Sequence, residues 1–105
     1  MLRRIKRRYL VLEIDSGEVF GSKELMDAIW SAVSRLFGEY GASKAGLTLI
    51  DYDVERRLLV VRVAHTALDM VNAALASITR IRDKPVAVHV ITVSGTIKTL
   101  YRRIK

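Results

Sequence analysis

Cysteine is absent from the chain, and its absence removes several kinds of chemistry at once. Without thiols there is no disulfide framework, no thiolate metal site and no cysteine nucleophile. The lack also fits a reducing, cytoplasmic setting. Histidine is scarce as well, because His65 and His89 are the only two and neither has a nearby pair of acids at ligand spacing. We therefore expect ordinary sheet histidines and no zinc site.

Long apolar runs are also missing. No run approaches the roughly 20 residues that a membrane-spanning helix requires. The opening MLRRIKRRYL leads into an amphipathic pattern that contains acids, where a signal peptide would carry its apolar centre. We expect an unprocessed chain without a membrane partner.

Acidic residues are missing from both ends of the chain. Nine of the eighteen basic residues lie in these ends, namely Arg3, Arg4, Lys6, Arg7, Arg8, Lys98, Arg102, Arg103 and Lys105. The remaining sequence holds the other nine basic residues and all eleven acidic ones, so the middle is nearly neutral. A formal charge of +7 with basic ends favours a polyanionic partner, either nucleic acid or an anionic membrane surface.

The apolar residues, half of a 105-residue chain, suffice for one domain, which we assign to residues 1–105. Alternation with a period of two predicts strands at residues 9–15, 47–53, 58–64 and 86–93, the second and third joined as a hairpin. Helical spacing predicts helices at residues 22–38, with Ser22 as N-cap, and from Thr66 to about Ile78. The segment 38–46 is expected to be a loop.

This order of elements is βαββαβ, typical of ferredoxin-like and RNA-recognition-motif-like α+β domains with an antiparallel sheet. A third helix, residues 94–105, follows the last strand, and residues 1–8 form a basic N-terminal arm. The first two helices bury apolar stripes on the sheet. We place in these stripes Leu25, Ile29, Val33 and Leu36 of the first helix and Leu68, Val71, Leu75 and Ile78 of the second.

The open face of the predicted sheet does not look like a base-stacking surface. RNA-recognition motifs stack bases on aromatics of the central strands, but the strand at 58–64 has no aromatic. Tyr9, with Arg62 and His89 near it, could still meet a base. The apolar side chains that share this face, Val11, Val60 and Ile91, favour a face covered by the extra helix or by a partner.

Candidate catalytic residues are few. Asp51 and Asp53 share one face of a strand and could bind hydrated magnesium or act in acid–base chemistry; an edge or turn role is the alternative. Ser94 has no histidine close in sequence and is expected to be a helix N-cap. We identify no catalytic residue, and expect neither a metal site nor a tightly bound cofactor in the chain.

The C-terminal helix combines an apolar stripe with a basic ridge. Ile97, Leu100, Tyr101 and Ile104 recur at helical spacing and should dock on the domain. At about 100° per residue, Lys98, Arg102 and Lys105 then share an outward ridge, with Arg103 farther around. Ser94 and Gly95 at the helix start offer backbone N–H groups to phosphate. A solvated cationic face is the alternative.

The first helix carries more apolar surface than docking on a sheet needs. Met26, Trp30 and Phe37 flank its buried stripe and widen the apolar arc to about 140°. This excess predicts a protein interface, unless a loop of the same domain covers it.

The residues of the last helix also carry a family resemblance. VSGTIKTLYRRI resembles the C-terminal signature of ribonuclease P protein component 2, a small RNA-recognition-motif-like subunit of archaeal and eukaryotic ribonuclease P. AIWSAVSRLFGEYGASKAGLTLIDYD and LLVVRV are similar to that family's first helix and strands. The resemblance covers about residues 8–104, and the paralogous fourteen-kilodalton subunit shares the domain. The hairpin at 54–57 lacks the glycine expected of many members.

The resemblance implies a subunit of the enzyme that removes 5′ leaders from precursor tRNA, in which the RNA component carries catalysis and uses magnesium. The implied partners are ribonuclease P RNA, precursor tRNA through the holoenzyme, and the TIM-barrel-like protein component 3. It further implies a dimer of such heterodimers. A general basic RNA-binding module and a ferredoxin-like regulatory domain outside ribonuclease P remain the alternatives.

Overall fold

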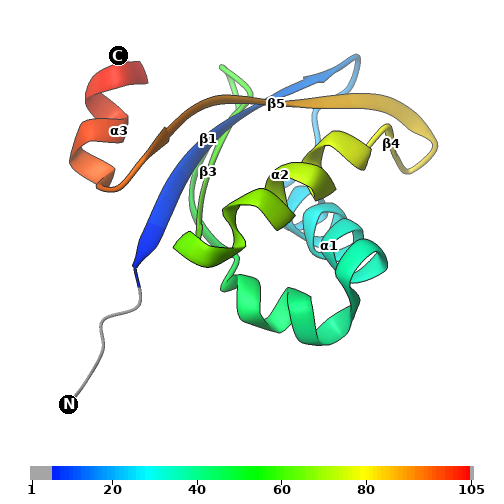
Figure 1. Cartoon of the computed structure of the whole chain (residues 1–105). Helices are drawn as coiled ribbons and strands as arrows, with labels where there is room; N and C mark the ends of the chain where they lie inside the picture. The colour runs from blue at the N-terminus through cyan, green and yellow to red at the C-terminus, as the bar shows by residue number, and fades with distance from the viewer. Residues whose placement is uncertain (1–5, 105) are drawn as a thin grey trace.

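A computed structural model describes residues 6–104 of the chain (Figure 1). The elements follow in the order β1 (Arg7–Ser16), α1 (Ser22–Ala45), β2 (Thr48–Asp53), β3 (Leu58–Ala64), η1 (His65–Ala67), α2 (Leu68–Ser77), β4 (Arg80–Ile81), β5 (Lys84–Ser94) and α3 (Ile97–Ile104). The predicted α+β class with a βαββαβ core and an additional C-terminal helix is confirmed. Within the described residues, no helix has the length and apolar character needed to cross a membrane.

The sheet has the strand order β2-β3-β1-β5-β4, and every pair of neighbours is antiparallel. The central strand β1 sends Leu10, Leu12 and Ile14 toward one face, and all three are buried. Tyr9 and Val11 point to the opposite face, as the period of two along a strand requires. The sheet therefore has two apolar faces, and the side chains on each must be buried by packing against other elements.

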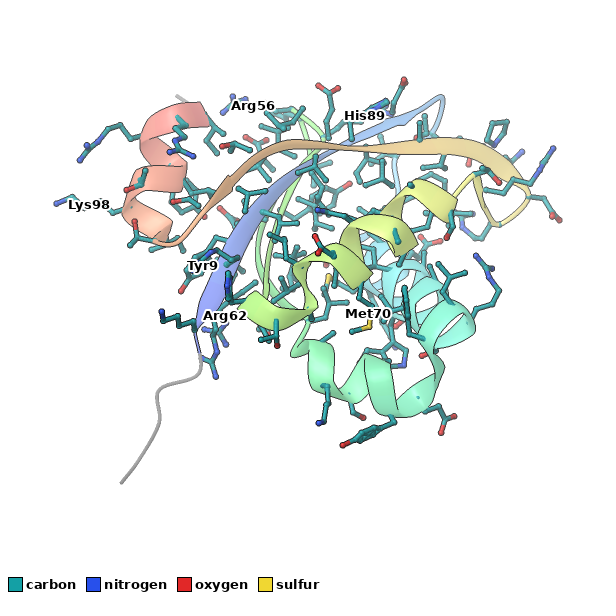
Figure 2. The ribbon with its side chains drawn as sticks, viewed as in Figure 1. Tyr9, Arg56, Arg62, Met70, His89 and Lys98 are labelled. Carbon is teal, nitrogen blue, oxygen red and sulfur yellow. The ribbon has the colours of Figure 1, made fainter. Side chains whose placement is uncertain are left out.

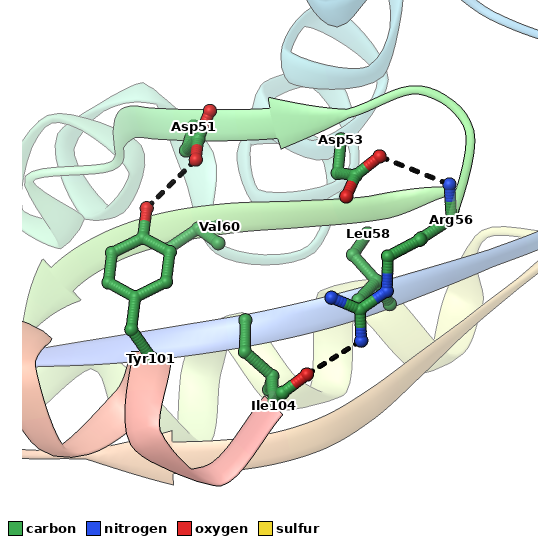
Figure 3. Close-up of a pocket in the computed structure, with 7 residues that line it drawn as sticks. All are labelled: Asp51, Asp53, Arg56, Leu58, Val60, Tyr101 and Ile104. Atoms are coloured by element: carbon green, nitrogen blue, oxygen red, sulfur yellow. Dashed lines mark hydrogen bonds between the residues drawn. The ribbon is translucent and has the colours of Figure 1, made fainter.

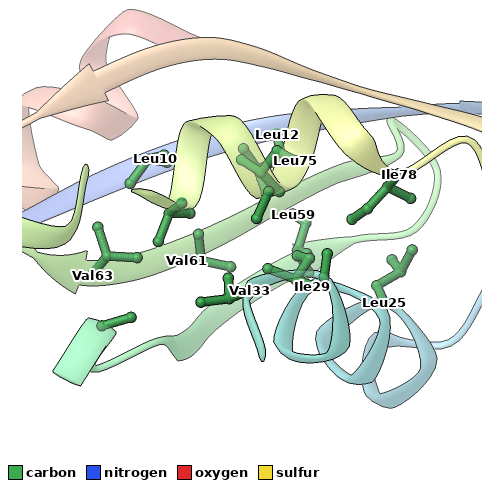
Figure 4. Close-up of a cluster of buried hydrophobic side chains, with 14 of the residues drawn as sticks. Leu10, Leu12, Leu25, Ile29, Val33, Leu59, Val61, Val63, Leu75 and Ile78 are labelled. Atoms are coloured by element: carbon green, nitrogen blue, oxygen red, sulfur yellow. The ribbon is translucent and has the colours of Figure 1, made fainter. Parts of the chain in front are cut away.

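Helices α1 and α2 pack side by side on the first face and build the main core (Figures 1 and 4). Leu25, Ile29 and Val33 of α1 and Leu75 of α2 are at most 2% exposed, as their helical spacing predicted. The expectation for Leu36 is wrong, because this side chain is 46% exposed. It lies just before a break in α1, after which other residues take over the contact with the core.

The break in α1 falls at Gly38, whose φ of 78° and ψ of 167° are not helical. The segment predicted as a loop is helical beyond it, up to Ala45. Ala42 and Ala45 are buried there, so the second part of the helix is held by its own contact with the core. Gly46 ends the helix in the left-handed conformation, with φ of 62°.

Both predicted N-caps of these helices are wrong. Gly21, not Ser22, is the N-cap of α1, and its backbone N–H donates to Glu24 Oε1 at 3.4 Å. Thr66 lies within the 3₁₀ turn η1, and α2 starts after Ala67. Because the 3₁₀ turn η1 comes first, α2 begins at Leu68 and not directly after Thr66.

Two tight turns use a left-handed backbone without glycine. Strand β4, which the sequence pattern missed, pairs with the start of β5 through Arg82 and Asp83, both at positive φ. In the β2–β3 hairpin Arg57 has φ of 57°, where related chains were expected to have glycine. Its guanidinium donates to the carbonyls of Ser16 at 2.6 Å and Glu18 at 3.1 Å, and these bonds offset the strain of the turn.

Candidate nucleic-acid interface

Helix α3 lies across the face of the sheet that faces away from α1 and α2 (Figure 1). Leu100 is fully buried against Val11, Leu58 and Val60. The prediction that an extra helix covers this face is therefore confirmed for Val11 and Val60. Ile91 stays 49% exposed, because a register shift in the β1–β5 pairing leaves it without a partner on β1.

Polar contacts fasten α3 at three places. Tyr101 Oη donates to Asp51 Oδ2 at 2.9 Å, and Arg56 Nη2 donates to the carbonyl of Ile104 at 2.6 Å (Figure 3). Arg103 Nη1 donates to the carbonyl of Val93 at 2.9 Å and to Thr92 Oγ1 at 3.2 Å. Burial raises the pKa of Tyr101, and both the hydrogen bond to Asp51 and the negative charge of that carboxylate raise it further.

These contacts surround a pocket of about 180 Å³ between α3 and the β2–β3 hairpin. Asp51 and Asp53 do share its rim, as the two-residue spacing predicted. Both carboxylates have protein partners, because Asp51 accepts from Tyr101 and from the backbone N–H of Tyr52, while Asp53 accepts from the backbone N–H of Arg56. No group of three potential metal ligands occurs among residues 6–104.

Ser94 does not cap α3, so that prediction is wrong. Ser94 is the last residue of β5, only 7% exposed, and its hydroxyl both accepts from the Thr96 N–H at 3.2 Å and donates to the Thr96 carbonyl at 2.9 Å. Thr96 Oγ1 accepts the N–H of Thr99 at 3.3 Å and acts as the cap. Gly95 is exposed beside the Arg8 guanidinium.

The basic ridge of α3 faces outward, as predicted, in the part that the structure describes. Lys98 and Arg102 are exposed, and neither has a carboxylate within 4.0 Å among residues 6–104; Lys98 extends away from the body in Figure 2. Lys105 lies outside the described residues. Arg103 differs from its neighbours, because its contacts with β5 hold it against the domain.

Strand β1 begins within the segment predicted as a basic N-terminal arm, residues 1–8. Arg7 and Arg8 belong to β1 and pair with Ala64 and Val63 of β3. Lys6 is exposed, and its carbonyl accepts the N–H of His65 at 2.8 Å. Arg3 and Arg4 lie outside the described residues.

The predicted group of Tyr9, Arg62 and His89 is only partly assembled. Tyr9 and Arg62 are directly opposite each other on β1 and β3. His89 pairs instead with Glu13, four residues along β1, and Figure 2 shows it apart from the other two. His89 Nε2 lies 3.8 Å from Asp15 Oδ2.

The predicted protein interface on α1 has two exposed members and one that is largely internal. Trp30 and Phe37 are 42% and 44% exposed, whereas Met26 is partly buried against the core. Tyr40, beyond the break in the helix, is 65% exposed and adds to the apolar surface. The loop suggested as an intramolecular cover is itself helix, so Trp30 and Phe37 keep their exposure.

Arg56 holds the end of α3, a role that the sequence did not reveal. It stands 48 positions before Ile104, whose carbonyl it binds, and its own segment shows only a polar turn. No local pattern could have identified this contact.

Fold and surface together define an RNA-recognition-motif-like α+β domain whose sheet is closed by an added basic helix. Within this class the chain belongs to the Rpp14/Pop5 family, whose family model matches residues 8–105. Among curated relatives, ribonuclease P protein component 2 of Pyrococcus furiosus is 33% identical over 100 residues, covering 95% of this chain and 83% of that protein. The protein of the same name from Methanosarcina acetivorans is 30% identical, covering 90% of this chain and 70% of its own length. The family suggested by the C-terminal motif is thus confirmed.

A solved structure supports the fold independently. A chain in the cryo-EM structure of yeast ribonuclease MRP superposes with a TM-score of 0.70 at 14% identity. The match covers 99% of this chain and 92% of that one, so α3 and the sheet belong to the shared architecture.

Proposed function

We propose that this chain is a protein subunit of ribonuclease P that binds and stabilises the catalytic RNA. The family membership and the relatives named ribonuclease P protein component 2 support this role. A ribonucleoprotein partner also suits a chain whose formal charge is +7.

The observation that carries the RNA contact is the fixed orientation of α3. Leu100 is buried beneath the helix, and the Tyr101 and Arg56 hydrogen bonds hold it at its C-terminal half. Lys98 and Arg102 are consequently held outward in one orientation. Cations on a fixed helix lose less freedom on binding phosphate than cations on a mobile segment do.

The finer partners belong to the same proposal. Magnesium and catalysis would reside in the RNA, and precursor tRNA would be met through the holoenzyme. The exposed Trp30 and Phe37 would contact protein component 3 in a dimer of heterodimers, within the cytoplasm. Aromatic anchors of this kind are typical of interface centres.

Reconstitution of precursor tRNA cleavage tests the function. Holoenzyme assembled with its RNA and remaining protein subunits should process the 5′ leader efficiently with this chain and poorly without it. Lys98→Gln with Arg102→Gln should weaken binding to the enzyme's RNA and lower the salt slope of log affinity by about 1.4 to 1.8, given roughly 0.7 to 0.9 per phosphate contact.

Lys23→Gln with Lys44→Gln is the matched control, because it removes the same charge from exposed positions of α1. Equal behaviour of the two double variants would show that α3 is only a solvated cationic face. No effect of omitting the chain on processing would count against the ribonuclease P role itself.

A further inference from the structure

A polar groove lies between α1 and the end of α2, on the side of the sheet away from α3. Its volume is about 250 Å³, and its lining contains two arginines, three hydroxyl groups and no acid. The lining residues are Ala28, Ser31, Ala32, Arg35, Ser77, Ile78, Thr79 and Arg80. The arginines stand 45 positions apart and come from different elements, so the fold alone brings them together.

Among residues 6–104, each guanidinium makes one hydrogen bond, to a neutral group, and its other N–H donors have no partner. Arg35 Nη2 donates to Ser77 Oγ at 3.3 Å, and that hydroxyl donates in turn to the carbonyl of Ala74 at 2.7 Å. Arg80 Nη1 donates to the carbonyl of Asp83 at 2.9 Å. A guanidinium carries five N–H donors, so most of those on each arginine remain available.

The charge of the groove is not neutralised by the described part of the chain. The ion pairs within residues 6–104 join Arg82 to Glu24, Lys84 to Glu18 and His89 to Asp15, so Arg35 and Arg80 have no carboxylate within 4.0 Å. Two guanidinium groups that line one groove together with three hydroxyl groups supply the donors for planar, bidentate recognition of phosphate oxygens.

The shape of the groove also suits an anion. Ala28 and Ala32 present only methyl groups from α1, and Ser31 between them adds a short hydroxyl. Small side chains leave room for a ligand to reach both arginines.

The negative end of the α2 dipole is an alternative reason for the position of Arg35 near Ser77. It does not explain Arg80, whose guanidinium is bound to the Asp83 carbonyl, away from that helix end.

We propose that this groove binds a phosphate group, and that its source is the backbone of an RNA strand. The RNA assignment rests on the function proposed above and deepens it. Because α3 lies across the other face of the sheet, the chain would then hold RNA phosphates on both sides and connect two segments of the folded RNA (Figure 1).

Nuclear magnetic resonance tests the anion site with inorganic pyrophosphate as the probe. The side-chain Nε–Hε signals of Arg35 and Arg80 should shift together and saturate in the parent chain. Ser31→Glu places a carboxylate beside both arginines and should abolish these shifts, whereas the neutral Ser31→Gln should retain them. Circular dichroism of each variant confirms that it is folded. Shifts that never saturate, or that persist in Ser31→Glu, would overturn the proposal.

Binding of ribonuclease P RNA tests the source of the phosphate. Arg35→Gln with Arg80→Gln should weaken affinity by about tenfold to a hundredfold, which corresponds to about 1.4 to 2.8 kcal/mol at 1.4 kcal/mol per decade. The salt slope should also fall by about 0.7 to 0.9, the amount expected for the loss of one phosphate contact. Lys23→Gln with Lys44→Gln carries the same charge change outside the groove and should leave both quantities close to those of the parent.

The outcomes separate this proposal from the function. If the α3 variant loses RNA affinity while the Arg35/Arg80 variant matches the control, the RNA assignment of the groove is wrong and the function stands. If the chain neither binds the RNA nor supports processing, yet pyrophosphate saturates the groove, the proposed role in ribonuclease P is wrong. The groove would then bind a small polyphosphate, and its RNA assignment would fall as well.

Discussion

The two faces of the central sheet are closed by unequal means. On one face α1 and α2 bury a large apolar cluster drawn from β1, β3 and both helices (Figure 4). On the other face α3 encloses a small cluster of buried residues, Val11, Leu58, Val60 and Leu100. The face covered by α1 and α2, called the helix face below, therefore supplies most of the stability of the domain. Helix α3 on the other face contributes less.

Hydrogen bonds partly compensate for the small contact area under α3. Tyr101, Arg56 and Arg103 each connect the helix to a strand or hairpin of the sheet. Polar contacts near the surface contribute less than apolar burial, but they are directional. Together they set the orientation of the basic ridge without making α3 part of the main core.

The largest effect should come from the helix face. Leu59 is fully buried in the large cluster, so Leu59→Ala should lower the free energy of unfolding by about 3 kcal/mol, through lost burial and the cavity that remains. Urea denaturation followed by circular dichroism measures this value. A loss below about 1 kcal/mol would show that the helix face does not dominate stability.

Leu100→Ala offers the matched change on the other face, because Leu100 is equally buried. We expect a loss of about 2 kcal/mol, limited by release of α3 while the rest of the domain stays folded. Hydrogen exchange should then show lost protection in α3 and retained protection in β1 and β3. Uniform loss across the sheet would mean that α3 is integral to the core.

Two partly buried tyrosines, Tyr101 and Tyr52, allow the two faces of the sheet to be compared. Tyr101→Phe removes the bond to Asp51, and Tyr52→Phe removes the bond from Tyr52 Oη to the Phe20 carbonyl, at 2.7 Å; each should cost about 1 kcal/mol. Only Tyr101→Phe should weaken the protection of α3 backbone amides against hydrogen exchange. Equal loss in α3 from both variants would contradict the separate roles of the faces.

The pH dependence adds a second measurement. Burial, the bond to Asp51 and the charge of Asp51 raise the pKa of Tyr101 above its ordinary 10.0, so the folded state holds the phenol proton more tightly than the unfolded chain. Its contribution to stability is complete below about pH 10 and is lost as pH rises through the folded-state pKa. Unfolding free energy measured across this range should fall more in the parent than in Tyr101→Phe. Parallel curves would contradict the contact.

The smallest effect on stability should come from the ridge itself. Lys98→Gln with Arg102→Gln removes exposed charges without an ion pair among the described residues, so the free energy of unfolding should change by less than about 0.5 kcal/mol. Thermal denaturation checks this. A larger loss would mean that the ridge holds α3 in place, and reduced RNA affinity could no longer be assigned to phosphate contacts.

Local sequence pattern was sufficient for most of the elements and for most of the residues on their buried sides. The alternation in β1 predicted which residues face the helices, and the spacing of Leu25, Ile29 and Val33 predicted the docked side of α1. The stripe of Ile97, Leu100, Tyr101 and Ile104 predicted that α3 docks and that Lys98 and Arg102 point away. Its first member is an exception, because Ile97 is 37% exposed. These features depend on the repeat of one strand or helix, which a short segment carries by itself.

Tertiary structure decided which side chains meet. The continuation of α1 past Gly38 depends on burial of Ala42 and Ala45, and no rule about glycine alone anticipates it. Arg103, placed with the RNA-binding residues by its charge, also has its guanidinium bound to β5, which the sequence did not predict. The bond from Arg56 to Ile104 and the groove that Arg35 and Arg80 both line bring together positions far apart in the chain. Such pairs arise only when packed elements bring distant segments within hydrogen-bonding range, so their geometry is a property of the folded domain.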